Sequence, residues 1–346
     1  MNAPLTLRDI ARQAGVSLAT VDRVLHNRPG VRADTVRRVK DAMTRSAFQP
    51  HAAASELARA RTRRFAFVMP AGVNLFMQQI QAHLGEMANW MAARRLSVEV
   101  VATDVFDPAI LAARLEDLVG RVDGVAVVAL DHPSVRAAIN DLVESGAKIV
   151  TLVSDVPSSR RHHYVGIDNI AAGRAAGALV GRFTGGRSGR VAIMAGSHGL
   201  RDHAERIFGF TQVMASEYRQ LVVLPVVEGH DDDDRSEHLM RRVLADHRDI
   251  VGLYNVGAGT AGVAKALTEP LNETGRAGDI VFVGHDVTAV TRKLLLNGVM
   301  DAVISQNPGH EARSAVRVLL ALVRGEPLLS EQEAIRIDIV MRDNLP

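Results

Sequence analysis

Hydrophobic positions at the N-terminal end of the chain recur at helical spacing. Two short amphipathic helices are predicted, with apolar faces made of Leu7, Ile10, Ala11 and Ala14 and of Val21, Val24 and Leu25. Gly15 lies between them, and its access to positive φ lets it end the first helix and turn the chain sharply. A third amphipathic run follows over residues 33–45. This pattern is typical of a helix-turn-helix, although similar helix pairs occur in domains that bind no nucleic acid.

From residue 65 the pattern changes to short continuous apolar runs between helical stretches. The first series predicts strands over 65–70, 97–102, 124–130 and 148–153 and helices over 75–95, 108–119 and 133–145. The second begins near Tyr164, with helices over 169–183, 202–217, 235–246 and 259–269 and strands over 190–195, 221–227, 250–255 and 279–284. Such runs indicate parallel strands covered on both faces. We therefore expect an α/β body of two doubly wound lobes, with a ligand site between them at the carboxyl ends of the strands.

These patterns divide the chain into three parts. A helix-turn-helix head is expected over residues 1–49, a hinge helix and linker over 50–63, and a two-lobed body over 64–346. Within the body, the N-lobe is expected to comprise about 64–166 and 307–333, and the C-lobe about 167–306 and 334–346. The alanine-rich stretch 51–59 favours helix but is too short to be stable alone, so we expect it to order only with support from DNA or a partner.

Charge is distributed unevenly along the chain. Residues 1–64 contain thirteen Lys and Arg against five Asp and Glu, a formal charge of +8. Because the whole chain carries +2, the remainder sums to −6. A basic head on an acidic body favours contact between the head and the phosphates of nucleic acid.

Composition excludes several classes of protein. The chain has no cysteine, which rules out disulfides, thiolate zinc sites and cysteine nucleophiles. It has no run of eighteen apolar residues and no hydrophobic signal segment after Met1, so we expect a cytoplasmic protein that does not contact a membrane.

Three stretches resemble enzyme or metal motifs only weakly. "GAGTAG" (257–262) has the spacing of a dinucleotide-binding loop but lies late in the chain, without an evident acidic partner for a ribose. "AGSHG" (195–199) lacks the first glycine of a nucleophile elbow. In "HDDDDRSEH" (230–238) adjacent acids diverge, which favours a solvated helix N-terminus over a cation site. We therefore expect no enzyme activity, no cofactor and no metal.

The segment "TLRDIARQAGVSLATVDRVLHNRPGVRADTVRRVKDAM" resembles the lactose/galactose-repressor family of bacterial transcription regulators. The body resembles the sugar-binding lobes of that family and of periplasmic ribose-type binding proteins, through "VGIDNIAAGRAAG", "ERIFGF" and "VFVGHD". The resemblance implies a homodimer whose recognition helices enter successive major grooves of a palindromic operator. We expect no tetramer, because the chain carries no heptad tail after its last strand.

The resemblance also implies roles for residues of the head. Leu18 and Ala19 take the main base-reading positions, where they offer only apolar contact, so Arg23 carries most of the hydrogen-bond readout. Leu57 matches a hinge leucine that is inserted into the minor groove to kink the central step. Four other residues suit contacts with phosphates: Ser17, Thr20, Asn27 and Arg32. The candidate DNA-interface residues are Thr6, Ser17, Leu18, Ala19, Thr20, Arg23, Asn27, Arg32 and Leu57.

In the body, the resemblance carries over polar side chains at strand ends. Carboxylates and amides suit vicinal hydroxyls, Arg forks onto two oxygens, and an aromatic ring stacks on an apolar sugar face. The candidate effector-binding residues are Asn74, Phe76, Ser154, Asp155, Arg206, Asn255, Asp286 and Gln306. The segment after "VTLV" departs from the ribose pattern, which leaves pentoses, hexoses, polyols and cyclitols open.

The sequence thus predicts a DNA-binding transcription regulator, a repressor, controlled by a small sugar-like effector. A purine-type corepressor is the alternative within this class. A sugar- or nucleotide-binding enzyme and a periplasmic transport receptor share the predicted fold, but the basic head argues against both.

Overall fold

The computed structural model describes residues 7–25, 28–46, 61–72, 74–272 and 279–346. The chain divides into two compact units, Met1–Thr62 and Arg63–Pro346. The hinge stretch 51–59 lies outside the described residues.

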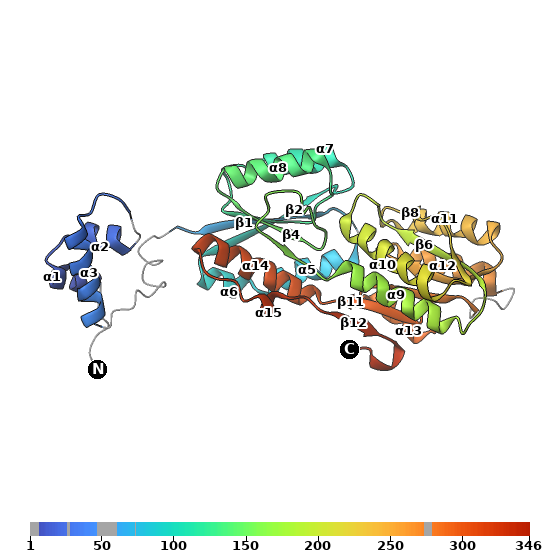
Figure 1. Cartoon of the computed structure of the whole chain (residues 1–346). Coiled ribbons are helices and arrows are strands. Elements are labelled where there is room, and N and C mark those ends of the chain that lie inside the picture. Colours follow the sequence, from blue (N-terminus) through green and yellow to red (C-terminus); the bar gives the residue numbers. More distant parts are fainter. Residues whose placement is uncertain (1–6, 26–27, 47–60, 73, 273–278) are drawn as a thin grey trace. The chain divides into compact units, whose positions relative to one another are not determined.

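The described residues of the first unit form three helices, α1 (Leu7–Ala14), α2 (Leu18–Leu25) and α3 (Ala33–Arg45) (Figure 1). Gly15, with φ of +63°, ends α1. The N–H of Gly15 donates to the carbonyl of Arg12, and the N–H of Val16 donates to that of Ala11. This glycine-terminated helix end closes the turn into α2. The helices share a core that includes Ile10, Ala14, Val21, Val24 and Val39.

The N-lobe is built on a five-stranded parallel sheet in the order β2-β1-β3-β4-β5. Its strands are β1 (Arg63–Pro70), β2 (Leu96–Thr103), β3 (Gly124–Val127), β4 (Lys148–Leu152) and β5 (His163–Val165). Alternation along β1 separates the two faces: Phe65 and Phe67 pack with α5 (Leu75–Glu86) and α14 (Pro308–Arg324), whereas Ala66 and Val68 pack with α7 (Pro108–Glu116) and α8 (Pro133–Glu144). Figure 1 shows α7 and α8 on one side of this sheet and α14 on the other.

The C-lobe is built on a seven-stranded sheet. Six strands run in the order β12-β11-β10-β9-β6-β7, and β8 also pairs with β6. They are β6 (Gly189–Ala195), β7 (Leu221–Val223), β8 (Val227–Glu228), β9 (Ile250–Asn255), β10 (Val281–His285), β11 (Ala302–Gln306) and β12 (Ile337–Val340). Only β12 runs antiparallel to its neighbour among these described pairings.

Helices cover both faces of the second sheet. On one face lie α9 (Asn169–Phe183) and α10 (Arg201–Glu217), and on the other α11 (Asp233–Asp246), α12 (Thr260–Asn272) and α13 (Ala289–Leu296). Shorter elements are α6 (Ala88–Ala93), α15 (Ser330–Glu333) and the 3-10 helix η2 (Arg342–Asn344).

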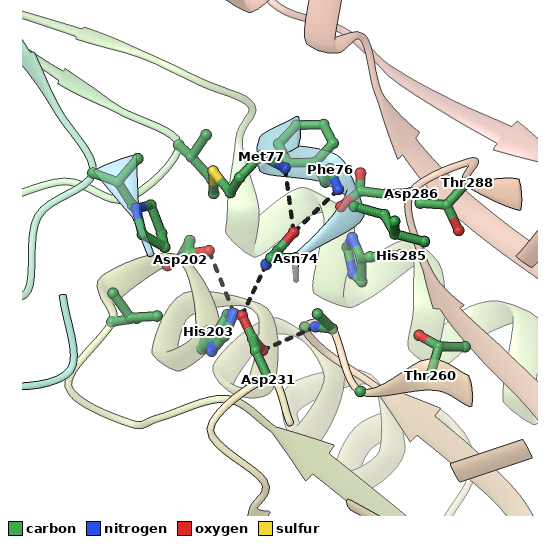
Figure 2. Close-up of a pocket in the computed structure, with 18 of the residues that line it drawn as sticks. Asn74, Phe76, Met77, Asp202, His203, Asp231, Thr260, His285, Asp286 and Thr288 are labelled. Atoms are coloured by element: carbon green, nitrogen blue, oxygen red, sulfur yellow. Dashed lines mark hydrogen bonds and ion pairs between the residues drawn. The ribbon is translucent and has the colours of Figure 1, made fainter. Parts of the chain in front are cut away.

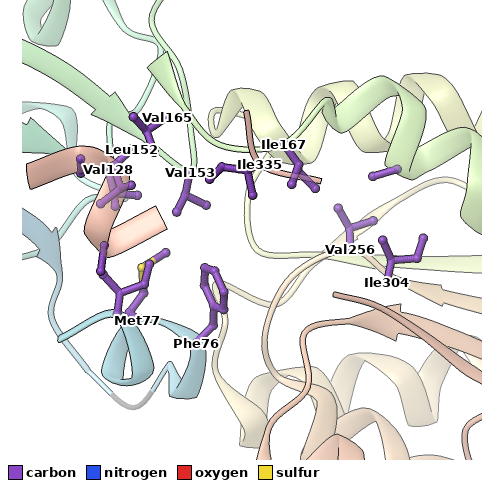
Figure 3. Close-up of a cluster of buried hydrophobic side chains, with 14 of the residues drawn as sticks. Phe76, Met77, Val128, Leu152, Val153, Val165, Ile167, Val256, Ile304 and Ile335 are labelled. Carbon is purple, nitrogen blue, oxygen red and sulfur yellow. The ribbon is translucent and has the colours of Figure 1, made fainter. Parts of the chain in front are cut away.

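The chain crosses between the lobes three times, after β5, after β11 and before β12. Apolar side chains from these crossings, among them Val165, Ile167 and Ile335, belong to one buried cluster with Val153 and Val256 (Figure 3). This cluster extends from the first sheet to the second, so the lobes share a continuous core at the crossings.

The α/β class, the three-helix head and the parallel sheets are confirmed. Two predicted elements differ in detail. The predicted helix 75–95 is two helices, α5 and α6, which meet at Met87. The predicted strand 221–227 is interrupted between β7 and β8, where Pro225 has no N–H to donate to a sheet.

Candidate functional site

A pocket lies between the lobes of the body, at the carboxyl ends of the strands. It encloses about 840 Å³ of space, including its open mouth. The N-lobe contributes the start of α5, and the C-lobe contributes the start of α10 and the loops after β8, β9 and β10 (Figure 2). A pocket at a switch point of parallel sheets suits a small organic ligand.

Asn74 links the two lobes across the pocket. Its Oδ1 accepts from the N–H groups of Phe76 (3.1 Å) and Met77 (3.3 Å), which caps α5. Its Nδ2 donates to Oδ2 of Asp231 at 3.0 Å, and Oδ1 of Asp231 accepts from the N–H of Ala258 at 2.9 Å (Figure 2). Phe76, which follows the cap, is buried and lines the pocket.

Arg206, which lies on α10, lines the pocket and is only 2% exposed. Its Nε donates to Oδ1 of Asn169 at 2.8 Å, and its Nη1 donates to the carbonyl of Val256 at 2.9 Å. Oδ2 of Asp202 lies 3.8 Å from Nη2. The guanidinium is therefore fixed by neighbours before any ligand arrives, which pre-organises it to bind.

Gln306 connects Arg206 to a buried acid. With its amide oriented to satisfy both neighbours, its oxygen accepts from Nη2 of Arg206 at 3.2 Å and its nitrogen donates to Oε1 of Glu311 at 3.2 Å. Glu311 lies on α14 and is fully buried. Burial raises the pKa of Glu311 well above its usual range.

Two further titratable groups, both from the end of β10, line the pocket. Burial raises the pKa of Asp286 to about 7, against the opposing effect of the Arg206 guanidinium. Burial and the nearby guanidinium hold the pKa of His285 well below its usual range, so the imidazole is neutral. Its Nε2 lies 2.8 Å from the hydroxyl of Tyr254.

The structure gathers five of the predicted body residues around this pocket: Asn74, Phe76, Arg206, Asp286 and Gln306. The other three lie outside its lining and make side-chain contacts elsewhere. Ser154 Oγ accepts from the N–H of Arg201 at 3.1 Å. Asp155 pairs with Arg161 and accepts from Thr151. Asn255 donates to Thr260 Oγ1 at 2.9 Å and holds the loop after β9.

Sequence reasoning missed eight polar residues of the lining: Asp202, His203, Asp231, Asp233, Thr260, His285, Thr288 and Thr291. The first two lie one turn before Arg206 on α10, and His285 precedes Asp286, so proximity to predicted residues was the available signal. Within "HDDDDRSEH", Asp232 does cap a helix, since it accepts from the N–H of Arg235 at 2.7 Å. Asp231, unlike Asp232, does not cap the helix. Its φ is +58°, and its side chain reaches Asn74.

In the first unit, α2 presents an exposed face. Ser17 Oγ accepts from the N–H of Thr20 at 3.2 Å and so caps the helix. Leu18 is 43% exposed, and Ala19 and Arg23 are exposed beside it. Thr20 is half-buried, and Arg32 is exposed before α3. Three predicted interface residues lie outside the described residues: Thr6, Asn27 and Leu57.

Comparison with known proteins agrees with both units. Residues 65–327 match the family described as periplasmic binding protein domain, and residues 6–51 match bacterial regulatory proteins, lacI family. The chain belongs to the lacI family. The resemblance seen in the sequence is thereby confirmed.

Two relatives of this lacI-family protein show how far the similarity extends. The catabolite control protein A of Staphylococcus aureus (strain MRSA252) is 23% identical over 63% of each chain. The HTH-type transcriptional regulator pepR1 of Lactobacillus delbrueckii subsp. lactis is 36% identical over 24% of this chain and 25% of its own. The alignments thus span less than two thirds of these relatives.

Among solved structures, an ABC transporter solute binding protein from Burkholderia graminis C4D1M, in complex with D-arabinose, superposes with a TM-score of 0.75. It is 25% identical and covers 82% of the lacI-family chain and 97% of its own. Within the described residues, no helix is long and apolar enough to cross a membrane. Nor does that part of the chain bring together three side chains able to hold a metal ion.

Proposed function

We propose that this lacI-family protein is a DNA-binding transcription regulator, a repressor, whose affinity for its operator is set by a small hydroxylated effector. One observation carries the proposal. The same chain has a helix-turn-helix with an exposed α2 and a pocket whose polar side chains come from both lobes of its body. The proposal includes a cytoplasmic location and no enzyme activity.

The exposed face of α2 supports the DNA-binding part. Arg23 supplies directional hydrogen bonds to base edges, and Leu18 and Ala19 supply apolar contact such as that with a thymine methyl. Ser17, Thr20 and Arg32 suit phosphates, as does Asn27, and Thr6 is a further candidate for the interface. Leu57 is the proposed minor-groove wedge. We infer a palindromic operator read by a homodimer that assembles through the body.

The geometry of the pocket supports control by an effector. Asn74 and Phe76 belong to the N-lobe, whereas Arg206, Asp286 and Gln306 belong to the C-lobe. A ligand that engages both sets stabilises the closed arrangement of the lobes over the open one, and only such differential binding shifts an equilibrium. Closure then moves the N-lobe, which continues into the linker to the head, and changes DNA affinity.

The chemistry of the lining supports a sugar-like effector: a pentose, hexose, polyol or cyclitol. Carboxylate, amide and guanidinium groups match hydroxyls, and Phe76 suits the apolar face of a sugar ring. The relative with D-arabinose bound has the same two-lobed fold.

Two measurements on the full-length protein test this function. A thermal-shift screen of sugars, polyols and cyclitols should identify a ligand, which at one hundred times its Kd stabilises the native state by about 2.7 kcal/mol. An operator selected from random DNA should then bind with an affinity that changes when the ligand is added. Operator affinity that does not respond to a bound ligand would refute control by the pocket.

A further inference from the structure

The pocket has more acidic than basic side chains. Among the described residues that line it, four are aspartates, Asp202, Asp231, Asp233 and Asp286, whereas Arg206 is the single Arg or Lys. Neutral hydroxyls can donate hydrogen bonds to carboxylates, but they do not cancel their charge. The composition of the lining therefore carries information about the charge of the ligand.

Two of the four aspartates are satisfied by their surroundings. Asp231 accepts from Asn74 and from the N–H of Ala258. Asp233 lies in the first turn of α11, where the helix dipole favours a negative charge, and it accepts from the N–H of Gly262 at 3.2 Å. These two acids need no cation from a ligand.

The positive charge of Arg206 is already shared. Asp202, only 4% exposed, places Oδ2 at 3.8 Å from the guanidinium, and its Oδ1 has no hydrogen-bond partner among the described residues. Glu311 lies behind Gln306, fully buried, and its Oε2 also has no partner there. The guanidinium therefore already has Asp202 beside it and is linked to the buried Glu311 through the amide of Gln306.

Asp286 is left without a cation of its own. It is half-buried, lines the pocket beside His285, and has a φ of +64° that turns the chain at the end of β10 (Figure 2). Its described side-chain partner is Gln306, which is uncharged and can instead face Arg206 and Glu311. Within the described residues no Arg, Lys or His forms an ion pair with Asp286. A half-buried carboxylate that has no cation beside it is stabilised when a cationic ligand pairs with it.

We propose that the effector carries a protonated amino group among its hydroxyls, as an amino sugar, an aminopolyol or an aminocyclitol does, and that Asp286 binds the ammonium. The inference deepens the proposed function and rests on it. Neutral hydroxyl groups elsewhere in the lining, such as those of Thr260 and Thr288, suit the hydroxyls of the ligand. Phe76 and Phe106 supply the apolar contact that a ring or a chain of carbons needs.

Calorimetric titration of the full-length protein at pH 8 tests this with matched pairs of ligands. The probes are D-glucosamine, D-galactosamine, D-mannosamine, glucamine and scyllo-inosamine, each beside the alcohol that has a hydroxyl in place of the amine. For at least one pair the amine should bind about tenfold more tightly than the alcohol, since a hydrogen bond to a charged group is worth more than a neutral one. Alcohols that bind as tightly as their amines, or amines that all fail to bind, would overturn the inference.

The variant Asp286→Asn assigns the preference to one carboxylate. Asparagine tolerates the positive φ of this position and keeps a side chain of the same shape, so the loop is preserved. The amine should lose its advantage in this variant and bind no more tightly than the alcohol that is paired with it. Asp234→Asn is the matched control, because Asp234 is exposed in the same acidic run as Asp231 and does not line the pocket. An amine preference that survives Asp286→Asn would refute the assignment.

Failure of the inference can be told apart from failure of the proposed function. If neutral sugars bind as tightly as amines and change operator affinity, the regulator stands and the amino group is refuted. If an amine binds preferentially but operator affinity does not respond to it, the ligand class stands and control of DNA binding by the pocket is refuted.

Discussion

Asn74 and Asp231 are joined by a hydrogen bond of 3.0 Å that spans the two lobes of the body. The same Asn74 amide caps α5 through its oxygen, so its orientation is fixed by the helix that it begins. A second contact nearby, from Nε2 of Gln79 to the carbonyl of Val287 at 3.0 Å, also joins the lobes. The lobes are therefore held together by direct contacts of their own, and a ligand adds to them.

The substitution Asn74→Ser should open the lobes in the absence of ligand. Serine can still cap α5, but it is too short to reach Asp231, so only the bond between the lobes is lost. Because the chain has no cysteine, spin labels can be attached at Glu116→Cys and His238→Cys, which are exposed on α7 and α11. The distance between the labels should lengthen in Asn74→Ser and shorten when ligand binds. An unchanged distribution in the ligand-free variant would contradict this role.

Replacement of Arg206 by methionine should destabilise the body by about 3–5 kcal/mol, because it leaves buried carboxyl groups without their cation. Chemical denaturation at pH 8 measures the loss. Arg182→Met, which removes an exposed arginine of α9, should change stability by less than about 0.5 kcal/mol. Equal effects of the two substitutions would show that Arg206 does not hold the buried cluster together.

The stability of the ligand-free protein should depend on pH through Asp286. Its folded pKa of about 7 exceeds the ordinary value of 3.8, so between these values the native state retains a proton that the unfolded chain releases. Stability therefore falls as pH rises from about 4 to 7 and then levels off. Asp202 acts on Asp286 in the same direction as burial, whereas Arg206 and Gln306 oppose it.

Asp286→Asn isolates this effect because it removes the titrating group and retains the other acids. Its melting temperature relative to wild type should increase from pH 5 to pH 8. Differential scanning fluorimetry across that range provides the measurement. A constant difference between the two proteins would mean that Asp286 is ionised throughout.

Arg23→Ala should relax the base preference of the head and leave most of the salt dependence of DNA binding in place. A base contact carries sequence information, whereas the remaining phosphate contacts set the salt slope. Binding to a panel of single-base operator variants, at two salt concentrations, separates these effects. Arg12→Ala is the control, because Arg12 is exposed on α1, outside α2. A loss of affinity by Arg23→Ala that is uniform across the panel would assign Arg23 to the phosphates.

Much of the fold could be predicted because its signals are local. Gly15 marks the turn between α1 and α2, and the continuous apolar runs mark buried parallel strands. Where prediction was wrong, the cause was also local: Met87 divides one predicted helix, and Pro225 interrupts one predicted strand.

The pocket was harder to predict, because facing it depends on contacts between distant segments. Asp231 has a positive φ, and its side chain accepts a hydrogen bond from Asn74, which lies 157 residues earlier in the chain. Neither feature can be read from the local sequence. Asp155 follows a strand end as expected, yet Arg161 pairs with it and draws it away from the lining. No spacing in the sequence distinguishes these two acids.

The three crossings between the lobes have a mechanical consequence. Two lobes joined by one connecting segment could twist or slide in several directions. Three neighbouring segments, packed through Val165, Ile167 and Ile335, favour hinge bending about a single axis. Bending of this kind moves the N-lobe sheet as a whole, and β1 of that sheet is the strand that follows the linker from the head. The specificity of the pocket for its effector could thus change through substitutions in the lining alone, while the three connecting segments stay the same.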